Sequence, residues 1–181
     1  FLKDPRLCLT WPAWAAHGTV VVYVYRNPLA VADSLRRRNA FPLSLGLALW
    51  ERYNRGALEA LDGFAHVCIS YDHVAQDPSL LASSVEELAA LGVAVRRQVP
   101  ASLFEAGLRH AADTGAFLRD QRVLLTPEQE RLASYCEGLC AGDEPGTAPS
   151  ATPMLQARLH DQAAALAPLA TIVETRNERD E

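Results

Sequence analysis

Hydrophobic residues recur along this chain with two different periods, and each period predicts a different element. Thr19–Tyr25 is almost continuously β-branched or aromatic, which favours a strand buried on both faces, as in a parallel sheet. His66–Tyr71 is a second short apolar run of this kind. Between them, Ser44–Leu61 carries an apolar stripe at helical spacing, with most of its charged residues on the other faces. The order of strand, helix and strand indicates that the two strands lie parallel in one sheet.

Four further helices are expected, over Leu29–Arg38, Pro78–Leu91, Ser102–Leu118 and from Thr126 to about Leu139. Asn27 precedes the first of them and Pro28 takes its first position, a combination typical of helix starts. Gly92 closes the second helix as a C-cap. In the last helix, Thr126 is followed three residues later by Gln129, which is the spacing of a capping box.

The alternation of strands and helices predicts an α/β domain with a parallel, doubly wound sheet and helices on both of its faces. Phe1–Asp4 is expected to be the end of an earlier strand of that sheet. The partial domain covers 1–141 and becomes helical toward its end, and a Gly-, Pro- and Ser-containing linker follows over 142–153. The tail, 154–181, holds an amphipathic helix over 154–175 whose apolar face is expected to dock on the domain or to contact a protein partner.

Composition is that of a globular domain and gives no sign of a membrane span. The 181 residues are 49% hydrophobic, which is enough for one sizeable core, and no apolar run is long enough to cross a bilayer. The cysteines lack the spacing of a zinc site, so no metal is expected and buried reduced thiols are predicted at Cys8, Cys68, Cys136 and Cys140. Reduced thiols indicate a reducing compartment, and we therefore expect a cytoplasmic protein.

Charge is unevenly distributed along the chain, although the net charge is only −5. Residues 1–60 carry eight Lys and Arg against four Asp and Glu, whereas residues 61–181 carry nine against eighteen. A positive first third in an acidic protein favours a local anionic ligand over a nucleic-acid surface. Chance clustering of the arginines is the alternative.

The junction at Arg26, Asn27 and Pro28 has the features of an anion site. Ligands of a doubly wound sheet bind beyond the carboxyl ends of its strands, and a helix that starts there offers N–H groups and the positive end of its dipole. Arg26 ends the first strand and can contact a phosphate with its guanidinium fork. Ser34 lies two turns along the same helix and can reach the same group. In the alternative interpretation, Arg26 pairs with a carboxylate and Ser34 is a small buried residue.

Three segments resemble sulfotransferases that use 3′-phosphoadenosine 5′-phosphosulfate (PAPS), and the bacterial-type domain in particular. RNPLAVADS, residues 26–34, is similar to the segment that binds the 3′-phosphate of the nucleotide in this family. The resemblance implies that Arg26 and Ser34 bind this phosphate. SYDHVAQDP, residues 70–78, resembles the strand end near the adenine, and its tyrosine is Tyr71. LALWERYN, residues 47–54, looks like a helix of the same group.

A further match, KDPR, is similar to the segment that precedes the 3′-phosphate strand in that family. The resemblance implies that Lys3 contacts the transferring group or the leaving oxygen, that Asp4 replaces the usual His or Glu base, and that Arg6 lies at the nucleotide site. An ion pair between Asp4 and Arg6 is the structural alternative. With His110, Arg109 resembles the late basic element that closes over the nucleotide.

The resemblance covers about residues 1–93 and implies a P-loop-NTPase-like sheet that is incomplete at its N-terminus. The phosphosulfate-binding loop of the family should precede Phe1, and no G-x-x-G-K run occurs in the chain. We therefore expect the C-terminal portion of an enzyme that transfers a sulfuryl group from PAPS to a hydroxyl or amine, and this portion is expected to be inactive alone. A P-loop nucleotide kinase-like phosphotransferase and a non-catalytic interaction module are the alternatives.

Overall fold

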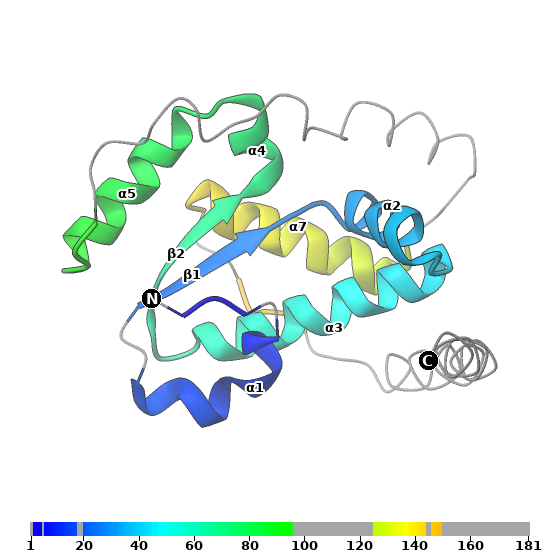
Figure 1. The fold of residues 1–181 in the computed structure, drawn as a ribbon, viewed down its shortest axis with the longest axis horizontal. Helices are drawn as coiled ribbons and strands as arrows, with labels where there is room; N and C mark the ends of the chain where they lie inside the picture. Colours follow the sequence, from blue (N-terminus) through cyan, green and yellow to red (C-terminus); the bar gives the residue numbers. More distant parts are fainter. Residues whose placement is uncertain (1, 5, 18–19, 96–124, 144–145, 150–181) are drawn as a thin grey trace, which may run out of the picture.

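The computed structural model describes residues 2–4, 6–17, 20–95, 125–143 and 146–149 (Figure 1). Along the chain the elements are α1 (Leu7–Trp14), the 3-10 turn η1 (Ala15–His17), β1 (Val20–Tyr25), α2 (Pro28–Asn39), α3 (Leu43–Leu61), β2 (Ala65–Ser70), α4 (Tyr71–Gln76), α5 (Leu80–Ala90) and α7 (Pro127–Ala141). Within these ranges no helix is both long enough and apolar enough to cross a membrane.

The two strands pair in parallel, with Val20 opposite Ala65 and Tyr25 opposite Ser70. The chain passes from one strand to the other through α2 and α3, as a parallel crossover requires. Helices α3 and α7 contact the strands from one side, α1 and α2 pack on α3, and α5 packs against β2 (Figure 1). The predicted α/β class is confirmed at this level, as a two-stranded parallel sheet with flanking helices.

Local capping explains why α2 and α7 begin at the predicted positions, whereas α5 spans Leu80–Ala90 and is shorter than the predicted 78–91. Asn27 Oδ1 accepts the N–H groups of Leu29 and Ala30 at 3.0 and 3.4 Å, and Pro28 takes the first position of α2. Thr126 and Gln129 form the reciprocal capping box of α7. Helix α4 is an addition to the predicted elements, because Ser70 accepts the His73 N–H and turns the chain into a helix where the strand was expected to continue.

Two predictions about strands are wrong. β1 is not buried on both faces, because Tyr23 and Tyr25 are buried whereas Val22 and Val24 are 37% and 57% exposed. Among the described residues, α3 and α7 cover only the tyrosine face of this strand. The segment Leu2–Asp4 is not a strand either. The carbonyl of Asp4 accepts the Leu7 N–H and its carboxylate accepts the Arg6 N–H, so the chain turns directly into α1.

Helix α3 approaches its neighbours closely because two glycines lie on the faces it presents to them. A Cβ at Gly46 would come within 2.8 Å of the Ala32 Cα in α2. A Cβ at Gly56 would come within 2.9 Å of the Cys8 carbonyl oxygen in α1. Both distances are shorter than van der Waals contact allows, so these glycines set how near α2 and α1 lie to α3.

The core lies between the strands, α3 and α7. Its buried members are Tyr23, Tyr25, Trp50, Leu61, Leu132, Ala133 and Cys136. The Tyr23 hydroxyl donates to Asn54 Oδ1 and lies 3.3 Å from the Cys136 sulfur, so one phenol contacts two helices. Asn54 in turn donates to the Trp50 carbonyl at 2.7 Å. Trp50 and Asn54 belong to the predicted LALWERYN helix, and both act here within the core.

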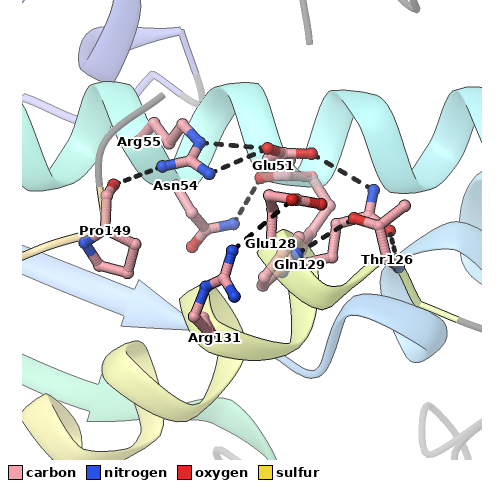
Figure 2. Close-up of polar contacts among 9 residues, drawn as sticks. Glu51, Asn54, Arg55, Thr126, Glu128, Gln129, Arg131 and Pro149 are labelled. Atoms are coloured by element: carbon pink, nitrogen blue, oxygen red, sulfur yellow. Dashed lines mark hydrogen bonds and ion pairs between the residues drawn. The ribbon is translucent and has the colours of Figure 1, made fainter. Parts of the chain in front are cut away.

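A buried polar cluster joins α7 to α3 (Figure 2). Arg55 donates from Nε and Nη2 to Glu51 Oε1 at 3.2 and 3.0 Å, and both side chains are almost fully buried. Gln129 of α7 donates to the other oxygen of Glu51 at 3.3 Å. The Arg55 Nη1 donates to the Pro149 carbonyl, which ties the segment after α7 to the same cluster.

A disulfide between Cys68 of β2 and Cys140 of α7 contradicts the prediction of reduced thiols at these two positions. Their Cα atoms are 4.8 Å apart, although 72 positions separate them in the sequence. Cys136, one turn earlier on α7, points into the core at Tyr23, and Cys140 lies where the same helix passes β2. The argument for a reducing compartment therefore loses the support of this pair.

Glu51→Ala is expected to lower the free energy of unfolding by about 3–5 kcal/mol, because it leaves the Arg55 guanidinium buried without its carboxylate. Glu59→Ala, an exposed glutamate on the same helix, is the matched control and should change stability by less than about 0.5 kcal/mol. Urea denaturation of both variants measures the difference. Equal effects would show that the buried ion pair is dispensable.

Reduction of the Cys68–Cys140 disulfide is expected to lower the free energy of unfolding by about 2–4 kcal/mol, because the unfolded chain regains the freedom of a long loop. Denaturation with and without a dithiol reductant measures this change. Cys140→Ser should abolish the effect of the reductant, and Cys8→Ser should leave it intact. An intact mass that corresponds to four thiols under oxidising conditions would contradict the assignment.

Candidate functional site

The candidate site is the corner at which β1 ends and α2 begins. Because Tyr25 pairs with Ser70, the next residues of the two strands, Arg26 and Tyr71, leave the carboxyl edge of the sheet side by side. The Arg26 guanidinium carbon lies 4.5 Å from the centroid of the Tyr71 ring, within the range of a cation–π contact. Tyr71 is 37% exposed, so this stack opens to solvent.

Among the described residues, Arg26 has no carboxylate partner of the kind that the structural alternative required. No ion pair to a described residue involves its guanidinium, and its Nε is buried without a hydrogen-bond partner among those residues. The nearby arginines differ in this respect, because Arg36 and Arg37 both pair with the buried Asp33. Arg26 therefore retains hydrogen-bonding capacity for an anion.

The start of α2 offers fewer N–H groups than the sequence indicated. Asn27 caps the N–H groups of Leu29 and Ala30, Pro28 has none, and the Val31 N–H donates to the Asn27 carbonyl within the helix. The Asn27 N–H itself donates to Asp72 Oδ2 at 2.8 Å. An anion at this corner must therefore be held mainly by side chains and by the helix dipole.

Ser34 is half-buried on α2, and no hydrogen bond joins it to Arg26 in the described part of the chain. Arg109 lies outside the described residues, as do the predicted helices over 102–118 and 154–175.

Lys3, Asp4 and Arg6 lie before α1, and among the described residues no hydrogen bond or ion pair joins them to the corner at Arg26. The alternative of a local ion pair is observed here. Arg6 donates from Nε and Nη2 to the two oxygens of Asp4 at 3.1 and 2.8 Å. These hydrogen bonds lower the pKa of the Asp4 carboxyl to about 2. So low a pKa makes Asp4 a weak base at neutral pH.

Neither of two hollows in the described surface includes the corner. The larger, about 660 Å³, lies at the turn between α3 and β2 and is lined by Leu58, Phe64 and Tyr135 among others. The smaller, about 290 Å³, lies between β2 and α5 beside the Cys68–Cys140 disulfide. Among the described residues, no group of three or more His, Cys, Asp or Glu side chains could hold a metal ion.

The residues that sequence reasoning missed at this corner are Trp50 and Asp72. The Trp50 indole N–H donates to the Arg26 carbonyl at 3.0 Å, and Asp72 accepts the Asn27 N–H. Both residues belong to segments that carried the family resemblance. However, their contacts with Arg26 and Asn27 depend on packing between distant parts of the chain, and no local pattern indicates them.

Comparisons of this chain with protein-family models, with curated proteins and with solved structures find no match.

Three titratable groups of the core behind the strands, Tyr23, Tyr25 and Cys136, have raised pKa values and are therefore neutral at pH 7. Burial, and then the Cys136 thiol, raise the pKa of Tyr23 above its usual range. Burial and the Glu137 carboxylate, which accepts the Tyr25 hydroxyl at 3.3 Å, do the same for the pKa of Tyr25. Burial also raises the pKa of Cys136 to about 11, so this thiol is a poor nucleophile at neutral pH.

The free energy of unfolding should fall as the pH rises above about 10, because the tyrosines then ionise in the unfolded chain but stay neutral in the folded one. A variant with both Tyr23→Phe and Tyr25→Phe should be less stable at neutral pH, because it loses the hydrogen bonds of both hydroxyls. Its stability should decline less steeply with pH. Urea denaturation at several pH values tests this. Parallel declines in the two proteins would contradict it.

Proposed function

We propose that this chain is part of a PAPS-dependent sulfotransferase and that the corner at Arg26 binds the nucleotide. One observation carries the proposal: a half-buried arginine without a carboxylate partner among the described residues lies on an exposed tyrosine, at the carboxyl end of a parallel strand. Parallel α/β sheets bind their ligands at this end of their strands. The combination suits an anionic group bound next to an aromatic base.

In this proposal, Arg26 donates to the 3′-phosphate through the part of its guanidinium that Tyr71 leaves free, and Ser34 adds a hydroxyl contact from the next turns of α2. Tyr71 lies beside the adenine. Arginine suits this role because its planar fork can donate two hydrogen bonds to one phosphate while its face stacks on an aromatic ring. The acceptor is a hydroxyl or an amine. The positive end of the α2 dipole adds to the attraction for the phosphate.

Sulfuryl transfer, by analogy with phosphoryl transfer, depends on positioning and on stabilising negative charge on oxygen. The role of this corner is to fix the nucleotide, so that the reacting sulfur is held at one place relative to the acceptor. Lys3 remains the proposed contact to the leaving oxygen. Asp4 remains the proposed base, although its ion pair with Arg6 lowers its pKa and makes it a weaker base than an unpaired carboxylate.

Arg26→Ala should weaken binding of adenosine 3′,5′-bisphosphate by about 10- to 150-fold, because it removes a charge-assisted contact of about 1.5–3 kcal/mol. Ser34→Ala should cost less, and Arg26→Lys should restore only part of the loss, since a point charge replaces a fork. Binding of adenosine 5′-monophosphate, which has nothing at the 3′ position, should hardly change. Calorimetric titration of each protein with both nucleotides measures these effects.

Arg38→Ala is the matched control, because it removes an exposed arginine at the far end of the same helix. It should leave the preference for the bisphosphate unchanged. Equal losses for both nucleotides in Arg26→Ala would show that Arg26 is structural. A wild-type chain that prefers ATP to the bisphosphate would favour the phosphotransferase alternative.

A further inference from the structure

The peptide unit between Arg26 and Asn27 is held at both of its polar atoms by side chains from other elements. Its carbonyl oxygen accepts the Trp50 indole N–H at 3.0 Å, and its N–H donates to Asp72 Oδ2 at 2.8 Å. A peptide unit is planar, so hydrogen bonds at both ends fix the orientation of the whole plane. The direction in which the Arg26 side chain leaves the strand depends on that plane.

Each of the two holding side chains is itself fixed. Trp50 is 3% exposed in the middle of α3, and its ring meets Tyr25 edge to face at a centroid distance of 6.4 Å. Asp72 lies in the first turn of α4, which Ser70 caps by accepting the His73 N–H. Tyr71, the residue before Asp72, is the one that stacks on Arg26. The same short helix therefore supplies both the aromatic ring that stacks on Arg26 and one of the two hydrogen bonds that hold the Arg26–Asn27 peptide unit.

We propose that Trp50 and Asp72 are positioning residues of the anion site, which together orient the Arg26–Asn27 peptide so that the guanidinium lies on Tyr71 with its free edge toward the ligand. This inference rests on the proposed function, because it assigns the pair a role in nucleotide binding. Neither residue contacts the ligand. Both act through the backbone of Arg26.

Asp72 has two effects that can be separated by mutation. Its oxygen accepts the Asn27 N–H, and its negative charge opposes the binding of an anion nearby. Asp72→Asn keeps an acceptor oxygen and removes the charge, whereas Asp72→Ala removes both. A comparison of these two neutral variants therefore isolates the hydrogen bond from the charge.

Asp72→Ala should bind adenosine 3′,5′-bisphosphate about 2- to 12-fold more weakly than Asp72→Asn, the range expected for one hydrogen bond. Asp72→Asn should bind at least as tightly as the wild-type protein. Trp50→Phe keeps an aromatic ring but loses the N–H, and should weaken binding relative to wild type by a similar factor. Binding of adenosine 5′-monophosphate should change little in any of these variants, whereas a merely structural role would affect both nucleotides alike.

Amide hydrogen exchange at Asn27, followed by NMR, gives a second measurement that needs no ligand. The Asn27 amide should exchange faster in Asp72→Ala than in Asp72→Asn. Asp77→Ala is the matched control, because the Asp77 carboxylate accepts the Ser79 N–H at 3.0 Å at the next helix start. It should affect neither the Asn27 amide nor the preference between the two nucleotides.

The outcomes separate the two claims. If the wild-type protein prefers the bisphosphate but Asp72→Ala and Asp72→Asn bind it equally, the proposed function stands and the positioning role is overturned. If the wild-type protein shows no preference for the bisphosphate, the proposed function fails. The positioning role fails with it, and faster exchange at Asn27 would then show only an anchor of the fold.

Discussion

The parallel pairing of β1 with β2 is the constraint on which most other contacts in this protein depend. Its register places Tyr25 beside Ser70, and the chain then leaves the sheet at Arg26 on one strand and at Tyr71 on the other. The same register sets Tyr23 beside Cys68, on the face that α7 covers. A shift of one residue would turn every side chain to the opposite face, so the core, the disulfide and the candidate site would be lost together.

Helix α3 stabilises this pairing through hydrogen bonds to a residue of β1, to the residue that follows this strand and to α7. Trp50 reaches the end of β1, Asn54 holds the Tyr23 hydroxyl, and the Glu51–Arg55 pair receives Gln129 from α7. The segment 47–54 therefore contributes to the fold through packing and buried hydrogen bonds. Buried charges of this kind stabilise a fold only when every partner is present, which is why loss of one member costs more than the pair contributes.

The chemistry of the corner depends on which of its hydrogen-bond donors already have partners and which do not. The N–H groups at the start of α2 are capped by Asn27, and the peptide before them is held by Trp50 and Asp72. The Arg26 guanidinium is the group that keeps unused donors, and its Nε is buried without a partner among the described residues. An anionic ligand recognised through an arginine fork and an aromatic ring is the chemistry that this arrangement supports, and the proposed nucleotide site rests on it.

Sequence alone determined the elements whose signals are local. The starts of α2 and α7 follow from Asn27 and from the Thr126–Gln129 box, because a capping side chain lies within three residues of the N–H it accepts. Only the tertiary structure decided which face of β1 is covered, that Cys68 meets Cys140, and that Trp50 and Asp72 hold one peptide unit. These contacts join residues far apart in the chain, and they arise from strand register and helix packing, which leave no trace in the local pattern of residues.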